Sequence, residues 1–155
     1  MGKVIALPHR TRRRRSVYRP ARPSCPHHVL LAYAGKGKRD YLAAFLAGRG
    51  HDVTTCSNGR QALDHLAARP FDLVVTGILM PHLDGLELVR ALRRRGPPAI
   101  AVAEGGHWMD AIYLRNAALC GAVATHTFCE AADDLLASVD WILKRRDDVI
   151  EGVVW

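Results

Sequence analysis

Residues 72–85 read Asp-Leu-Val-Val-Thr-Gly-Ile-Leu-Met-Pro-His-Leu-Asp-Gly. The first part, Leu73–Thr76, is a short run of apolar and β-branched residues, which is the composition of a buried strand. The second part contains the proline, aspartate and glycine residues that favour turns. The stretch therefore predicts a buried strand followed by a loop, with Gly77 at the junction between them.

The same alternation of short apolar runs and amphipathic segments extends from residue 28 to residue 146. Strand-like runs occur at 29–34, 52–57, 73–76, 99–103 and 122–126. Helical spacing of apolar residues occurs at 39–49, 58–69, 86–95, 108–119 and 131–146. Within 86–95, this spacing places Leu86, Val89, Ala91 and Leu92 inward and the four arginines largely outward.

Five strands that alternate with five helices imply a parallel sheet, because parallel strands need long crossover connections. The strands are continuously apolar, as expected when helices cover both faces of a sheet. We expect a flavodoxin-like, doubly wound α/β fold with three layers, α/β/α, over residues 28–146.

The net charge of +7 is concentrated in the first residues of the 155-residue chain. Residues 1–28 hold eight basic residues and no acidic one, whereas residues 29–155 hold fourteen basic and fifteen acidic residues. Residues 1–27 are rich in arginine and proline and have no hydrophobic periodicity, so we expect a disordered tail. At the other end, residues 147–155 are expected to form a short apolar tail.

The composition is that of a globular protein, with 49% hydrophobic and 24% charged residues. No apolar run approaches the roughly 18 residues that span a bilayer, so no membrane association is expected. The four cysteines are scattered, without a Cys-x-x-Cys pair, and no segment has the pattern of a secretion signal. Reduced thiols and a cytoplasmic location are the expectation.

Three motifs in this order resemble the receiver domain of two-component response regulators, of the CheY-like kind. They are Met80-Pro81-x-Leu83-Asp84-Gly85, Asn58-Gly59-x-x-Ala62-Leu63 and Ala118-Leu119-Cys120-Gly121-Ala122. The resemblance covers residues 28–146, about the full length of such a domain. It implies a signalling module of a phosphorelay.

Receiver chemistry needs a carboxylate nucleophile, two acidic residues that hold Mg²⁺, a lysine and a hydroxyl residue. The acidic pair falls here on Tyr33 and Ala34, the phosphoacceptor on Gly77, the hydroxyl residue on Ala103 and the lysine on Phe128. None of these residues has the required side chain. The resemblance, with these departures, indicates a degenerate pseudo-receiver that is not an enzyme, binds no cofactor or metal ion and takes no phosphoryl group.

Two acidic neighbours, Asp84 and Glu104, are candidates to replace the missing phosphoacceptor. Asp84 is expected to hold the turn before the third helix. Glu104, beside Ala103, is a lone carboxylate without metal ligands and a poor phosphoacceptor. Tyr33 and Phe128 are expected to fill the former acidic pocket with apolar surface, because clustered acids without a metal repel one another.

The resemblance also implies a partner-binding face on the fourth helix, fifth strand and fifth helix. The matching residues include Trp108, Tyr113, Arg115 and Trp141. Exposed aromatic and arginine residues are frequent at interaction hot spots, although helical spacing is equally compatible with burial in the core. We expect a stand-alone module that acts through protein–protein contact, with a signalling protein or a second copy as partner.

A second hypothesis is a nucleic-acid-binding regulatory protein that uses the receiver fold as a dimerisation scaffold. Its arm would be the run Arg12, Arg13, Arg14 and Arg15, which would bind phosphates with strong salt dependence. A start codon placed too far upstream in a GC-rich gene would produce a similar tail, so this alternative stays open.

Overall fold

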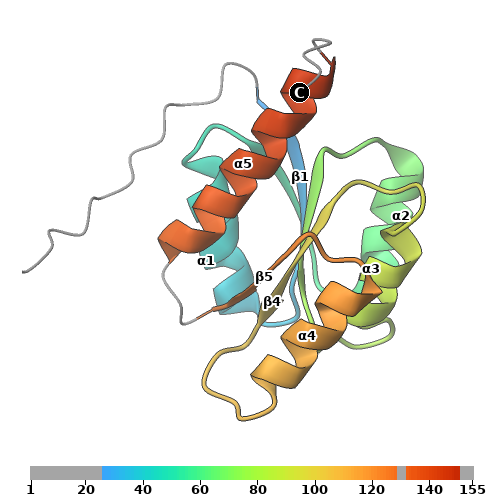
Figure 1. The fold of residues 1–155 in the computed structure, drawn as a ribbon, viewed down its shortest axis with the longest axis vertical. Coiled ribbons are helices and arrows are strands. Elements are labelled where there is room, and N and C mark those ends of the chain that lie inside the picture. Colours follow the sequence, from blue (N-terminus) through green and yellow to red (C-terminus); the bar gives the residue numbers. More distant parts are fainter. Residues whose placement is uncertain (1–25, 129–131, 151–155) are drawn as a thin grey trace, which may run out of the picture.

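The computed structural model of the chain describes residues 26–128 and 132–150, in which strands and helices alternate strictly (Figure 1). The strands are β1 (His28–Ala32), β2 (Asp52–Cys56), β3 (Leu73–Gly77), β4 (Ala99–Ala103) and β5 (Ala124–Thr127). The helices are α1 (Lys36–Ala47), α2 (Gly59–Ala68), α3 (Gly85–Leu92), α4 (Asp110–Cys120) and α5 (Ala132–Ile150).

All five strands pair in parallel in the order β2-β1-β3-β4-β5. Every residue of β3 and β4 is buried, as the continuous apolar runs predicted. The chain winds outward in both directions from β1, so the carboxyl ends of all strands lie at one edge, the lower edge in Figure 1. The predicted flavodoxin-like, doubly wound α/β fold is confirmed.

Helices cover both faces of the sheet and produce the expected three layers (Figure 1). On one face, Val29 and Leu31 of β1 pack with apolar residues of α1 and α5. On the other face, Leu30 and Val74 pack with α2 and α3, and a smaller cluster beside it joins β4 to Ala117 of α4. The five residues expected to point inward from α5 are all buried, namely Leu135, Leu136, Val139, Ile142 and Leu143.

Local hydrogen bonds set the helix ends. Asp84 caps α3: its side chain accepts from the backbone N–H of Glu87 at 2.8 Å, and the Glu87 carboxylate accepts from the N–H of Asp84 at 3.1 Å. The expectation that Asp84 holds this turn is confirmed. Asn58 caps α2 through the N–H of Gln61, and Gly121 ends α4 with a φ of 119°, which glycine adopts without strain.

Helix α5 extends past its predicted end at Arg146 and continues to Ile150. No proline or glycine interrupts this stretch. In addition, Asp147 is held in place by His27 at the start of the sheet, with 2.9 Å between Nε2 and Oδ1. Residues 147–150, which were expected to begin a tail, therefore belong to the helix.

The basic tail at residues 1–25 and residues 151–155 lie outside the described residues. Among the described helices, none combines the length and the apolar character that crossing a bilayer requires.

Candidate functional site

Four of the five positions singled out in the sequence meet at the carboxyl edge of the sheet. Tyr33 directly follows β1, Gly77 ends β3, Ala103 ends β4 and Phe128 directly follows β5. Backbone hydrogen bonds continue the sheet beyond the strands, from Tyr33 N to Cys56 O at 3.0 Å and from Phe128 N to Ala103 O at 2.9 Å. The fifth position, Ala34, follows Tyr33 and is half-buried. These positions therefore lie together at the carboxyl edge of the sheet.

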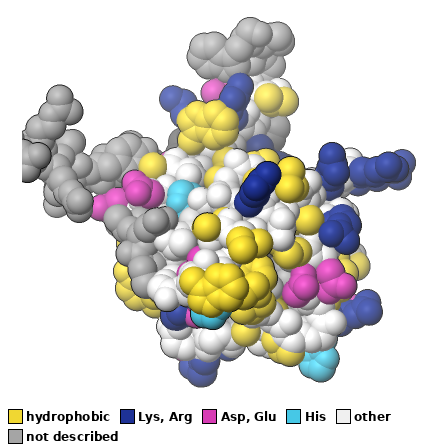
Figure 2. All heavy atoms as spheres, turned by 60° about the horizontal axis from the view of Figure 1, so that its bottom comes forward, with side chains coloured by type: hydrophobic (Ala, Val, Ile, Leu, Met, Phe, Trp, Pro, Cys, Tyr) yellow, Lys and Arg dark blue, Asp and Glu magenta, His cyan; other side chains and the backbone are white. Residues whose placement is uncertain are grey.

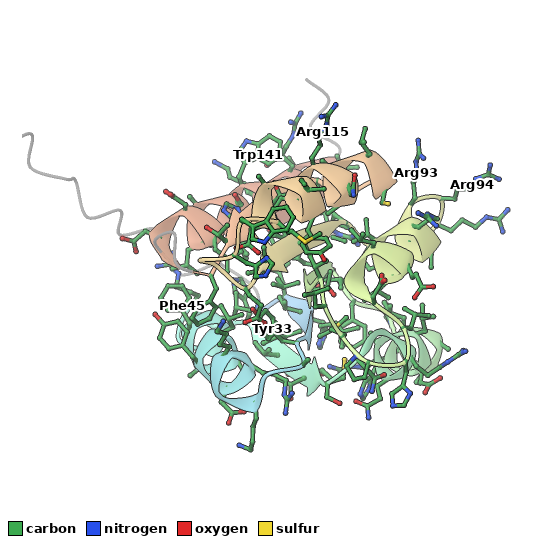
Figure 3. The ribbon with its side chains drawn as sticks, turned by 90° about the horizontal axis from the view of Figure 1, so that it is seen from below. Tyr33, Phe45, Arg93, Arg94, Arg115 and Trp141 are labelled. Atoms are coloured by element: carbon green, nitrogen blue, oxygen red, sulfur yellow. The ribbon has the colours of Figure 1, made fainter. Side chains whose placement is uncertain are left out.

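The ring of Tyr33 lies directly against the backbone of Gly77. A Cβ atom added to Gly77 would lie 3.1 Å from Cδ2 and 3.2 Å from Cε2 of Tyr33, closer than such atoms normally approach. Tyr33 is only 1% exposed and belongs to the core cluster formed with α1 and α5. Figure 3 shows it in the interior of the domain. Any side chain at residue 77 would have to displace this ring.

The loop after β3 keeps a close backbone approach. Gly85 N donates to Ile78 O at 2.8 Å, and a Cβ atom on Gly85 would lie 1.9 Å from the carbonyl oxygen of Gly77. No residue other than glycine fits there without moving the start of α3. The loop that resembles the family motif thus still requires a glycine at residue 85. The residue before this loop, Gly77, has no side chain.

Phe128 is the centre of an aromatic cluster that reaches from the core to the surface. Its ring centroid is 6.4 Å from that of Tyr33 and 5.7 Å from that of Tyr41, which is 53% exposed. Tyr41 also stacks on Phe45 at 5.9 Å. Apolar aromatic surface therefore occupies the place where a lysine was expected from the family pattern.

Lys38, on α1, reaches over this cluster and was missed by the sequence analysis. Its Nζ atom is 4.8 Å from the Phe128 centroid, donates to the backbone oxygen of Glu104 at 3.0 Å and forms an ion pair with the Glu104 carboxylate. Both side chains are partly exposed. The only acidic side chain beside Ala103 in the sequence is therefore already paired with a cation.

Arg39 satisfies the backbone oxygens at the end of β1. One guanidinium nitrogen donates to the carbonyl of Tyr33 at 2.7 Å and to that of Ala34 at 3.1 Å. A positive side chain thus lies beside the position where the family pattern has its acidic pair. No sequence signal distinguished this arginine from the other basic residues of the chain.

The residues at this edge do not fit Mg²⁺, which takes a shell of oxygen ligands that usually includes carboxylates. Tyr33, Ala34 and Gly77 supply no carboxylate, and the Glu104 carboxylate is paired with Lys38. Within residues 26–128 and 132–150, no group of three or more His, Cys, Asp or Glu side chains is placed to hold a metal ion.

Cys56, at the end of β2, is a potential nucleophile near the same edge. Burial raises the pKa of its thiol to about 11, against the smaller opposing effect of its hydrogen bond to the Asn58 backbone. The thiol is therefore protonated at neutral pH and is a poor nucleophile.

The expected partner-face residues have different environments. Trp108 and Trp141 are 79% and 58% exposed, and Arg115 is exposed. Tyr113 is half-buried and packs against the small cluster under α4. Arg115 and Trp141 project from α4 and α5 on the same side of the domain (Figure 3), whereas Trp108 lies in the loop before α4.

Trp141 borders an apolar hollow between β5 and α5. This hollow has a volume of about 330 Å³ and is lined by Val123, Ala124, Ala137, Ser138, Trp141 and Ile142. The Arg145 guanidinium lies 4.7 Å from the Trp141 ring centroid, a cation–π contact that helps to hold the indole in place. Figure 2, which brings the lower end of the domain forward, shows further hydrophobic side chains gathered near the middle of that face.

The proposed nucleic-acid arm, Arg12–Arg15, lies outside the described residues.

Comparisons with known proteins agree with the fold. The chain matches the response regulator receiver domain family over residues 35–144, more than half of its length. It is 38% identical over 71 residues to the response regulator MprA of Mycolicibacterium vanbaalenii, and 40% identical over 62 residues to the response regulator receiver protein CpdR of Brucella abortus. These matches cover 46% and 40% of this chain and 31% and 52% of the relatives, so the chain spans about a third to a half of their length.

Solved structures give the same result. The signal receiver domain of a signal transduction histidine kinase from Syntrophus aciditrophicus superposes with a TM-score of 0.65 at 26% identity, over 76% of this chain and 90% of that one. A response regulator receiver domain from Francisella superposes with a TM-score of 0.69 at 24% identity, over 77% and 98% of the two chains, and this likeness shows the fold alone. The chain therefore belongs to the response regulator receiver domain family.

Proposed function

We propose that this chain is a receiver module of two-component signalling that has lost its phosphoacceptor and acts through phosphorylation-independent contact with a protein partner. The observation that carries the proposal is the packing of Tyr33 on Gly77. A glycine cannot accept a phosphoryl group, and the buried ring above it fills the space next to the strand where an acceptor side chain would extend.

The remaining positions of the site support the same proposal. Ala103 has no hydroxyl group, and Phe128 has no charge with which to neutralise a phosphoryl group. The cations that approach this edge are already engaged, Lys38 with Glu104 and Arg39 with two backbone carbonyls. Among the described residues, this edge is thus satisfied internally, and neither an acceptor nor an unpaired carboxylate ligand remains at the former site.

The side of α4, β5 and α5 is the proposed contact surface. Trp141 and Arg115 are exposed there, next to the apolar hollow lined by Val123 and Ile142. Tryptophan and arginine contribute much of the binding energy in many interfaces, particularly when they border a pocket that a partner side chain can fill. The proposed partner is a signalling protein or a second copy of the chain.

A binding experiment tests the loss of phosphorylation. Mg²⁺ with beryllofluoride, a phosphoryl mimic, is added to the full chain and the melting temperature is measured. A ligand that binds only the folded state stabilises it by RT ln(1 + [L]/Kd). Because we expect this chain not to bind the mimic, the melting temperature should stay unchanged. A concentration-dependent rise would contradict the proposal.

A capture experiment tests the contact surface. The chain is immobilised and exposed to extract from its native cells, and the captured proteins are compared with those captured by the Trp141→Ala variant. The expected result is the loss of a specific partner. Leu79→Ala is the matched control, because Leu79 is equally exposed, at 57%, but lies in the loop after β3. A partner retained by Trp141→Ala and lost by Leu79→Ala would contradict the assignment.

The charge of the first residues supports a second candidate, nucleic-acid binding through the arm at Arg12–Arg15. Eight basic residues without an acidic one in residues 1–28 give the electrostatic footprint of a phosphate-binding segment. A gel shift with DNA or RNA tests it, with the full chain against a chain that lacks residues 1–27. Nucleic-acid binding that persists after the deletion would contradict this candidate, because it would not depend on the basic residues.

A further inference from the structure

The amino ends of β3 and β4 border a second concave region, at the edge of the sheet opposite Gly77. Its volume is about 510 Å³, within the range of small-molecule sites. Its walls come from the end of α2, the loops before β3 and β4, the end of α3 and one residue of α5. The lining residues are Leu66, Ala67, Arg69, Pro70, Phe71, Ala91, Leu92, Arg95, Gly96, Pro97 and Arg146. We refer to it as the arginine pocket.

Three arginine residues from three separate segments line the arginine pocket, and no acidic residue does. Two of them have an acidic neighbour outside the lining: Arg69 lies 3.7 Å from Asp52, and Arg146 lies 3.6 Å from Asp72. Arg95 is exposed and forms no ion pair within the described part of the chain. The pocket therefore keeps one uncompensated positive charge.

The Nε–H group of Arg146 is a hydrogen-bond donor without an acceptor on any described residue. Its Nε atom is buried and has no hydrogen-bond partner among the described residues. A buried N–H without an acceptor is unfavourable, and such a group is usually satisfied in a native protein. A ligand oxygen satisfies this N–H once the Arg146 side chain turns toward the pocket, which its exposure of 38% permits.

Part of the pocket lining is apolar. Phe71 and Leu92 are 5% and 7% exposed, and the Arg69 guanidinium lies 4.7 Å from the Phe71 ring centroid. A guanidinium that stacks on an aromatic ring keeps its outer face free for a second planar group. The pocket thus combines donors for an anion with a surface that suits a ring.

The walls of the pocket are rigid. Pro70 and Pro97 fix the two loops that enter the strands. Gly96 lies so close to α3 that a Cβ atom on it would be 2.5 Å from Cδ2 of Leu92, and its N–H donates to the Leu92 carbonyl at 2.8 Å. A preformed site loses little conformational entropy when a ligand binds.

We propose that the arginine pocket binds a small phosphorylated ligand with a planar body, of the nucleoside phosphate class. Arginine recognises phosphate oxygens through paired N–H donors, and here Arg95 lies in the turn after α3 and Arg146 on α5. The planar body lies on the outer face of the Arg69 guanidinium, which itself covers the buried Phe71 ring. The pocket is concave and of limited size, so it suits a small molecule better than a protein surface or a nucleic-acid backbone. This proposal is independent of the loss of phosphorylation at Gly77.

The test uses ¹⁵N-labelled full chain titrated with ADP, pyrophosphate and adenosine, while amide chemical shifts are followed. ADP is expected to shift the amides of Phe71, Leu92 and Gly96 in a saturable way. Pyrophosphate, which has the charge without the ring, is expected to bind more weakly, and adenosine more weakly still. Shift mapping separates the pocket from the basic residues at 1–25, because these contribute other amides.

Two neighbouring arginines give a matched pair of variants. Arg95→Gln removes the uncompensated charge of the pocket and is expected to weaken ADP binding about tenfold, with the fold unchanged because the side chain is exposed. Arg94→Gln changes the net charge equally, but Arg94 does not line the pocket and points away from the domain (Figure 3). Equal affinity in Arg95→Gln and the parent chain would overturn the proposal. Equal weakening by both variants, or equal affinities for ADP and pyrophosphate, would overturn it as well.

Discussion

The Tyr33 ring and the Gly77 backbone are in direct contact. The large ring fits because residue 77 has no side chain. A Cβ atom on Gly77 would approach Cδ2 of Tyr33 to 3.1 Å, so the glycine leaves the room that the ring needs. The pair is a packing unit at the place where the family pattern has a phosphorylation site. Its energetic coupling is measurable.

We predict that Gly77→Ala destabilises the protein by about 1–3 kcal/mol, because the added methyl group overpacks the contact with Tyr33. Urea unfolding gives the free energy. The control is the same substitution in a Tyr33→Ala background, where the cavity left by the ring accommodates the methyl group and the cost should largely vanish. An equal cost in both backgrounds would show that the contact does not limit residue 77.

Restoring the acceptor alone should not restore phosphorylation. Gly77→Asp introduces a carboxylate beneath a buried ring, without the metal ligands that Tyr33 and Ala34 fail to supply. We expect no phosphoryl adduct by mass spectrometry after incubation with acetyl phosphate and Mg²⁺. The comparison is a variant in which residues 33, 34 and 77 are all aspartate and residue 128 is lysine. A phosphorylated single variant would refute the argument that the whole site is lost.

Stability should fall in mild acid because of His51. This residue is 6% exposed, neither of its ring nitrogens has a hydrogen-bond partner in the described residues, and His27 lies 5.7 Å away between ring centroids. Burial lowers the pKa of His51; the nearby His27 and Arg49 lower it further, and Asp140 opposes them. The neutral form is therefore the one that the fold favours.

With the folded pKa of His51 below the unfolded value of about 6.5, the unfolded chain binds more protons in the window between them. The contribution of neutral His51 to the free energy of unfolding is complete above that pH window. It is lost as the pH falls through the window. Urea unfolding at pH 7.5 and at lower pH values measures this, and His51→Leu should reduce the slope. His28→Gln is the control, since His28 is exposed. A slope that His51→Leu leaves unchanged would assign the acid sensitivity to other groups.

The cap of α3 provides a fourth prediction. Asp84→Ala removes the acceptor for the Glu87 N–H and should cost about 1 kcal/mol, whereas Asp84→Asn keeps an acceptor and should cost a few tenths. Thermal unfolding of both variants measures the difference. Equal losses in the two variants would indicate that the charge of Asp84, rather than its hydrogen bond, matters.

Most of the fold could be predicted from the sequence because the strands are buried on both faces and carry uninterrupted apolar runs. Leu73–Thr76 was placed within one residue of the observed strand. In α3, however, Ala91 was expected to point inward but is exposed, and the buried residue is Leu88. Apolar residues on adjacent positions leave the direction of a short helix ambiguous, and packing on the sheet decides it. Similarly, α4 begins at Asp110 and not at Trp108, because the Asp110 side chain accepts from the N–H of His107 at 2.9 Å.

The candidate site was predictable only in part. Tyr33, Gly77, Ala103 and Phe128 follow strands, and the carboxyl ends of parallel strands meet at one edge, so their proximity followed from the fold. Lys38 was missed, because its contacts with Glu104 and Phe128 join segments far apart in the chain and leave no periodic pattern. The same holds for the arginine pocket, which only the packed structure brings together.

The link between His27 and Asp147 has a consequence for synthesis on the ribosome. These residues are 120 positions apart, and they join the residue just before β1 to α5, the last of the described helices. Because β1 lies inside the sheet, between β2 and β3, the earliest strand to emerge acquires its complete surroundings only when α5 has been made. The nascent domain should therefore stay sensitive to proteases until its final helix is released, and a pulse of protease on stalled chains of increasing length would locate that point.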